Sequence, residues 1–221
     1  MSTSQRVTLE IPSPEREQDF TAAVRRSRIL HGAFMSPPET RSQYRKYLAR
    51  LELPTHRGFF ICTESGELAG VVNVNEIVRG LFQSGYLGYY AFEPFAGKGF
   101  LSEGLRLVIR RAFRRECLHR LEANIQPGNA RSIELVKALG FRLEGFSPHY
   151  LKIAGRYRDH ERWAITVEDW KARRTQPRAA SKSDEAEPPP RKTMAELKAG
   201  LGRAVLKRRE RLKLARDARR T

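Results

Sequence analysis

The stretch from Tyr86 to Leu105 holds the residues best suited to binding an anion. An apolar run ends at Pro94, Gly97-Lys98-Gly99 follows, and a helical pattern begins at about Gly99. The first N–H groups of a helix have no internal partner and lie at the positive end of its dipole, so they bind phosphate well. Glycine lets the backbone approach such an anion closely. We therefore predict a phosphate-binding loop, although its spacing matches neither the P-loop nor the dinucleotide fingerprint.

Other residue types that often do chemistry give weaker signals. Cys62 and Cys117 are isolated, which is typical of reduced core thiols in a reducing cytoplasm. Asp159-His160 has no further histidine, cysteine or carboxylate at ligand spacing, so the sequence predicts no metal site. Five arginines between Arg106 and Arg115 share one helical pattern, and we interpret them as a solvated face.

The elements that must position the loop follow from hydrophobic periodicity. Strands are expected where apolar and polar residues alternate or where short apolar runs occur, and helices where apolar residues recur every three or four positions. Asn129 is a good N-cap and Gly140 a good terminator for the helix between them. The pattern predicts a mixed α/β sheet flanked by helices. The expected strands are 6–11, 58–63, 68–78, 82–92, 120–125, 141–151 and 157–167; the expected helices are 14–30, 39–51, 99–117 and 129–139.

Charge and composition divide the chain. Its net charge is +17, and residues 171–221 contribute 17 basic and 6 acidic side chains to it. We expect a domain over 1–170, a disordered linker rich in proline, serine and charge over 171–192, and a basic amphipathic helix over 193–221. The concentration of charge favours a polyanionic partner such as RNA. No apolar run is long enough to cross a membrane and no signal peptide is visible, so we expect a soluble, cytoplasmic protein.

Three segments in this order carry a family resemblance. They are GYLGYY followed by GKGFLSEGL, then HRLEANIQPGNARSIELVKALGFRLEGF, and finally YLKIAGRYRDHERWAIT. With them the chain resembles the GCN5-related N-acetyltransferases (GNAT), within them the enzymes that acetylate the N-terminal alanine of ribosomal proteins. The resemblance covers about Arg6 to Trp170 and implies the GNAT fold and acetyl-CoA as co-substrate.

The resemblance also implies roles for particular residues. Acetyl-CoA would place its pyrophosphate on the helix start and its pantetheine along the strand edge, as an added strand. A backbone N–H near Ala91 or Phe92 would polarise the thioester carbonyl. The implied cofactor-binding residues are Ala91, Phe92, Gly97, Lys98, Gly99, Phe100, Leu101, Ser102, Asn129 and Ser132.

The catalytic candidates that follow from the resemblance are Ser132, Asn124 and Tyr150. Many relatives carry a tyrosine four positions beyond Ser132 as the acid, but this chain has Val136 there. That favours Ser132 or a water as the donor of a proton to the CoA thiolate. Asn124, or Glu122 on the same side of its strand, could hold a water, and Tyr150 could line the amine side. No general base is identified.

The predicted function is acetyl-CoA-dependent acetylation of an α-amino group, with the N-terminus of a ribosomal protein as the expected acceptor. Two alternatives stay open: acetylation of a small amine, an antibiotic or an aminoacyl-tRNA, and a ribosome- or RNA-binding assembly factor that uses the fold as a platform. The basic tail would contact ribosomal RNA. A monomer and a homodimer both fit the sequence.

Overall fold

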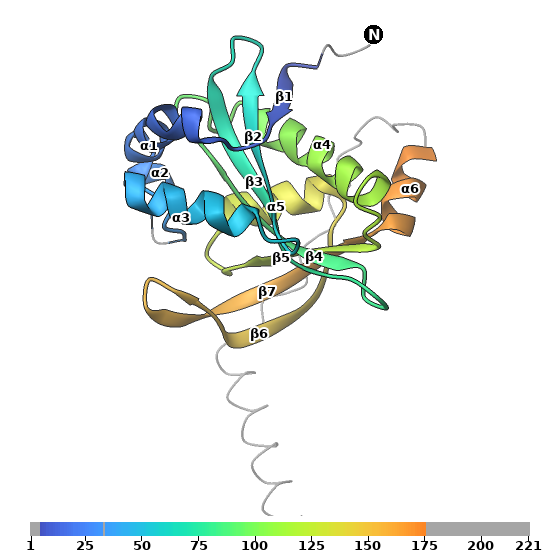
Figure 1. The fold of residues 1–221 in the computed structure, drawn as a ribbon. Helices are drawn as coiled ribbons and strands as arrows, with labels where there is room; N and C mark the ends of the chain where they lie inside the picture. The colour runs from blue at the N-terminus through green and yellow to red at the C-terminus, as the bar shows by residue number, and fades with distance from the viewer. Residues whose placement is uncertain (1–4, 33, 176–221) are drawn as a thin grey trace, which may run out of the picture. The chain divides into compact units, whose positions relative to one another are not determined.

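Seven strands form one mixed sheet in a computed structural model, which describes residues 5–32 and 34–175 (Figure 1). The order across the sheet is β1-β2-β3-β4-β5-β7-β6, and only β4 and β5 are parallel neighbours. The expected mixed sheet is thereby confirmed. The strands are β1 (Val7–Glu10), β2 (Arg57–Thr63), β3 (Leu68–Val78), β4 (Ser84–Ala91), β5 (Arg120–Ile125), β6 (Arg142–Ile153) and β7 (Arg156–Thr166).

Helices cover both faces of this sheet. Because side chains alternate along a strand, Phe59 and Ile61 of β2 face one helical layer and Phe60 and Cys62 face the other. The first layer contains α4 and α5, and the second contains α1 and α3 (Figure 1). The described helices are the 3₁₀ helix η1 (Pro14–Arg16) and the α-helices α1 (Glu17–Arg26), α2 (Arg28–His31), α3 (Arg41–Leu51), α4 (Phe100–Arg114), α5 (Ala130–Leu139) and α6 (Val167–Thr175).

The sheet opens between its two parallel strands. Strands β4 and β5 pair only over Ser84–Tyr86 and Arg120–Glu122. Beyond that point β4 stays paired with β3 as far as Ala91, and β5 stays paired with β7 as far as Ile125. The two strands therefore diverge into a V, and the inner edge of β4 lacks a neighbouring strand there.

The two cysteines have different surroundings. Cys62 is buried, whereas Cys117 is exposed, so the prediction of two core thiols was wrong for Cys117. Cys117 lies after α4 at the surface because the apolar stripe of that helix ends at Phe113. Burial and the Glu10 carboxylate raise the pKa of the Cys62 thiol to about 11.

Alkylation should distinguish these thiols. At pH 8 a thiol with that pKa is about one part in a thousand thiolate, so iodoacetamide should label Cys117 and leave Cys62 unmodified in the native protein. Peptide mapping by mass spectrometry checks this, with urea-unfolded protein as the control in which both react. Equal labelling in the native state would contradict the placement of Cys62.

The described residues end with α6 (Val167–Thr175). Residues 171–175, which were expected to begin a linker, continue this helix, and the Trp170 ring packs 5.6 Å from that of Phe113. The rest of the expected linker and the expected helix over 193–221 lie outside the described residues. Among the described residues, no helix is both long and apolar enough to cross a bilayer.

Candidate functional site

The start of α4 presents free backbone donors. Gly97 and Gly99 adopt φ of 74° and 87°, in the left-handed region that glycine tolerates best. The first intrahelical bond runs from Glu103 N–H to Gly99 O, and no side chain caps the helix. The preceding N–H groups of Phe100, Leu101 and Ser102 thus lack helical partners, as an anion site requires.

Arg6 adds a positive charge to this loop. Its backbone N–H and its Nε donate to the two oxygens of the Glu103 carboxylate, at 2.7 and 3.2 Å. Its guanidinium lies over the Phe100 ring at 4.9 Å and contacts Lys98 O. The residue that precedes β1 therefore brings a guanidinium to the phosphate loop, and Glu103 holds that arginine in place.

Leu101 does not crowd this anion site. Its Cδ1 lies 3.5 Å from the point where a Cβ on Gly70 would stand, so the side chain points at strand β3. The backbone N–H of Leu101 remains available at the helix start.

The inner edge of β4 can accept an extended ligand. The register with β3 is unbroken from Tyr86 to Ala91, and Phe92 N–H donates to Ala69 O at 2.9 Å. In an antiparallel ladder successive residues turn their N–H and C=O groups to opposite sides. The N–H and C=O groups of Ala91 and Tyr89 therefore face the V, whereas the N–H of Phe92 is hydrogen-bonded to β3. Of the two N–H groups expected to polarise the thioester carbonyl, that of Ala91 is available, whereas that of Phe92 is already bonded to β3. The N–H of Tyr89 also faces the V and is available for the same role.

His31 fixes one end of this edge. Its Nε2 lies 2.9 Å from Ala91 O, and because a carbonyl only accepts, Nε2 carries the proton. Burial lowers the pKa of the imidazole, so the ring is neutral at pH 7. The ring also packs edge-on to Tyr90 and Phe92, which holds the Ala91 peptide rigidly beside the V.

Asn129 and Ser132 lie on the opposite arm of the V. As expected from the sequence, Asn129 caps α5: its Oδ1 accepts from Ser132 N–H at 3.2 Å. The Ser132 hydroxyl forms a 2.6 Å hydrogen bond with the hydroxyl of Tyr89, which reaches across from β4. This bond joins β4 to the first turn of α5, the helix that follows β5.

The remaining catalytic candidates lie on the other face of the sheet. Asn124 of β5 stands beyond the last pair with β4, and its Oδ1 is buried with no hydrogen-bond partner among the described residues. The ring of Tyr150 lies 6.1 Å from that of His160. Burial has the largest effect in raising the pKa of Tyr86, followed by the charge of Glu122 and then by Tyr150. The Glu122 carboxylate accepts from Arg120 Nε at 2.7 Å and is therefore engaged in an ion pair.

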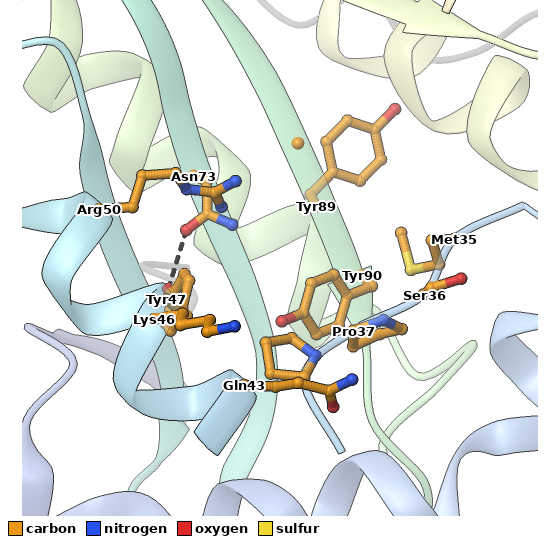
Figure 2. Close-up of a pocket in the computed structure, with 12 residues that line it drawn as sticks. Met35, Ser36, Pro37, Gln43, Lys46, Tyr47, Arg50, Asn73, Tyr89 and Tyr90 are labelled. Carbon is orange, nitrogen blue, oxygen red and sulfur yellow. Dashed lines mark hydrogen bonds between the residues drawn. The ribbon is translucent and has the colours of Figure 1, made fainter. Parts of the chain in front are cut away.

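A cavity of about 460 Å³ opens on the face that carries α3 (Figure 2). The Tyr47 hydroxyl donates to Asn73 Oδ1 at 2.9 Å in its wall, and Lys46 and Arg50 extend from the same helix. None of the described residues that line it is acidic. They are Met35, Ser36, Pro37, Pro38, Gln43, Lys46, Tyr47, Arg50, Asn73, Gly88, Tyr89 and Tyr90.

Across residues 5–32 and 34–175, no group of three or more histidine, cysteine or acidic side chains is arranged to hold a metal ion.

These features together define a class of site. An uncapped helix start beside a splayed strand suits a ligand with a diphosphate at one end and an extended, amide-bearing arm. The sequence matches the Acetyltransferase (GNAT) domain over residues 6–142, which is more than half of the chain, and the chain belongs to this family.

Curated relatives give more detail. The chain is 43% identical over 104 residues to the [Ribosomal protein uS5]-alanine N-acetyltransferase of Escherichia coli, covering 47% of this chain and 54% of that protein. It is 36% identical over 130 residues to the probable N-acetyltransferase YjcK of Bacillus subtilis, covering 58% and 72%. The match thus spans about half the length of the first of these relatives.

Solved structures share the fold. A Mycobacterium smegmatis RimJ in complex with CoA-disulfide superposes with a TM-score of 0.67 at 23% identity, covering 74% of this chain and 83% of that chain. A Vibrio cholerae spermidine N-acetyltransferase in complex with CoA and spermine gives 0.65 at 21%, covering 76% and 99%. At these identities the likeness shows the GNAT fold but not the acceptor.

Proposed function

We propose that this protein transfers the acetyl group of acetyl-CoA to the α-amino group of a polypeptide, with a ribosomal protein as the preferred acceptor. The observation that carries the proposal is the open inner edge of β4 beside the uncapped start of α4. Family membership and the CoA-bound structures of the same fold support acetyl-CoA as the donor.

The binding geometry assigns a task to each part. Arg6 and the N–H groups of Phe100 to Ser102 would hold the pyrophosphate, with Lys98 nearby. The Tyr89 and Ala91 backbone would pair with pantetheine, and one of their N–H groups would stabilise the oxyanion. The acetyl group would then lie between the V and the cavity, where an amine attacks it directly, and Ser132 would protonate the departing thiolate.

The charge of the cavity favours a peptide over a polyamine. Lys46 and Arg50 line it without any acidic residue among the described lining side chains. A polycation such as spermidine would be repelled there, whereas a peptide offers one amine followed by carbonyls and, in some sequences, carboxylates. The Escherichia coli relative is named a [Ribosomal protein uS5]-alanine N-acetyltransferase, and this name agrees with a peptide acceptor.

Two further parts of the proposal concern the setting of the enzyme. We place it in the cytoplasm, where ribosomes and acetyl-CoA occur together. Residues 171–221, which carry 17 basic side chains, would contact ribosomal RNA and raise the local concentration of substrate.

Competition between acceptors tests the choice of substrate. We expect kcat/KM for an alanine-starting peptide with an acidic residue among its first four to exceed that for spermidine by about 100-fold. Release of CoA thiol measures both rates. A higher value for spermidine would overturn the peptide assignment while leaving acetyl transfer intact.

Reversing the cavity charge should change this preference. The double variant Lys46→Glu/Arg50→Glu should lower kcat/KM for the acidic peptide by about 10- to 100-fold and raise that for spermidine. Arg45→Glu combined with Arg41→Glu reverses two charges of the same helix outside the cavity and serves as the control. If the ratio of kcat/KM for the acidic peptide to kcat/KM for spermidine did not change in the cavity variant, the proposed role of Lys46 and Arg50 would be contradicted.

A further inference from the structure

The Tyr89 side chain of the open edge reaches across the V to helix α5. It lies on β4 at the position where pantetheine would pair, and it also contributes to the acceptor cavity. Figure 2 shows its ring directed away from Tyr90 and Pro37, with the hydroxyl at the far end. That hydroxyl meets Ser132 Oγ at 2.6 Å, a short distance for two neutral hydroxyls.

The acidic residue of helix α5, Glu134, is ion-paired with Lys137 at 3.0 Å. One turn beyond Ser132, Val136 is fully buried in the core and has no ionisable group. The neighbouring Ile133 and Leu135 pack against the same core. A hydroxyl beside Ser132 is therefore supplied by the facing strand and not by the helix.

We propose that Tyr89 relays protons to Ser132 and holds its hydroxyl on the leaving thiolate, so that a strand tyrosine completes the acid of this site. This inference rests on the proposed acetyl transfer. Tyr89 acts on the thiolate only through Ser132. It is therefore a positioning residue that also donates a proton to Ser132.

The proton movements balance without any other reactant. The amine attacks the thioester carbonyl, the C–S bond breaks, and the electron pair leaves on sulfur. Ser132 Oγ–H passes its proton to that sulfur, Tyr89 Oη–H passes its own to Ser132 Oγ, and the proton lost by the new amide nitrogen restores Tyr89, directly or through one water. The products are the N-acetyl amide and CoA thiol, with both hydroxyls returned to their starting state.

The surroundings keep the phenol in the form that this relay requires. Burial raises the pKa of Tyr89 to about 12, and the hydrogen bond with Ser132 offsets this only in part. The phenol is therefore protonated throughout the neutral range, and it remains far more acidic than the serine hydroxyl that it supports. A serine alone is a poor proton donor, which explains why a second hydroxyl is useful here.

Single and double variants test the relay. Tyr89→Phe removes only the hydroxyl and should lower kcat by about 10- to 100-fold, with the KM for acetyl-CoA and the melting temperature nearly unchanged. Ser132→Ala should have a similar effect, and the double variant should be no slower than Ser132→Ala, because the two groups act in series. Tyr44→Phe, whose hydroxyl instead donates to Ser13 O at 2.7 Å, is the control and should keep its kcat. A Tyr89→Phe enzyme with wild-type kcat, or additive losses, would overturn the relay.

A pH profile separates proton transfer from simple positioning. A fluorinated tyrosine at position 89 keeps the shape of the ring but lowers the pKa of the phenol. Because the relay needs the protonated phenol, kcat of this enzyme should fall as pH rises toward that lower pKa, in a range where the wild type keeps its rate. A rate reduced by the same factor at every pH would show positioning without relay. If the wild type itself transfers no acetyl group, the proposed function fails instead.

Discussion

Gly97→Asp should weaken the binding of CoA by about 100-fold, because it places a carboxylate among the N–H groups that we propose hold the pyrophosphate. Gly97 has φ of 74° and open space around the point where its Cβ would stand, so the new side chain can be accommodated without a clash. Aspartate and asparagine both tolerate this left-handed conformation better than other residues do. Isothermal titration with CoA measures the effect.

Two matched variants isolate the charge. Gly97→Asn has nearly the same shape without the charge and should weaken binding only a few-fold. Gly66→Asp introduces the same residue at another open glycine with φ of 80°, in the turn between β2 and β3, and should bind CoA normally. Similar affinities for Gly97→Asp and Gly97→Asn would contradict a pyrophosphate site at this helix start.

Phe20→Ala should lower the free energy of unfolding by about 3–5 kcal/mol, which corresponds to a fall in melting temperature of about 10 °C for a domain of this size. Phe20 is fully buried in α1, and its ring lies 4.8–5.9 Å from those of Tyr44, Tyr47, Phe60 and Phe92. Removing it leaves a cavity under the layer that joins α1 and α3 to β2 and β4. Thermal unfolding followed by circular dichroism measures the loss.

Phe20→Leu provides the control. A leucine fills most of the space and should cost about 1–1.5 kcal/mol. Because Tyr47 also lines the cavity that we propose for the acceptor, Phe20→Ala should in addition raise the KM for the peptide more than the KM for acetyl-CoA. If both variants had the melting temperature of the wild type, this aromatic cluster would not stabilise the second helical layer.

The local parts of the site could be predicted from the sequence. The glycine loop and the Asn129 cap depend on residues close together in the chain, and both take the expected conformations. The strands and most helices likewise follow from periodicity, but the single helix expected over 14–30 is divided into η1, α1 and α2, and α6 was not expected. The opening between β4 and β5 was predicted only from the family resemblance, because the residue pattern of the two strands does not indicate it.

Contacts between distant segments could not be predicted. Arg6 reaches Glu103 across 97 residues, and Tyr89 reaches Ser132 across 43. Each depends on the order of strands in the sheet, which periodicity does not encode. The parity of β4 was the available signal for Tyr89, because it places that side chain on the face of α5. Likewise, Lys46 and Arg50 form part of a cavity only once the Met35–Pro38 segment folds against α3.

For Phe92, the prediction of an available N–H group was wrong by one residue. The apolar run ending at Phe92 gave no indication of which of its N–H groups faces β3. The bond from Phe92 to Ala69 settles this, because alternation then turns Ala91 and Tyr89 toward the V. A shift of one residue in the register of β3 would have exchanged these roles.

The most direct test of the central claim is the site of modification on a defined peptide. Purified protein is incubated with acetyl-CoA and an alanine-starting peptide that also contains an internal lysine, and the product is fragmented in a mass spectrometer. We predict that one acetyl group appears and that it lies on the α-amino nitrogen of the alanine. Acetylation confined to the lysine side chain, or no transfer by protein that binds CoA, would contradict the account.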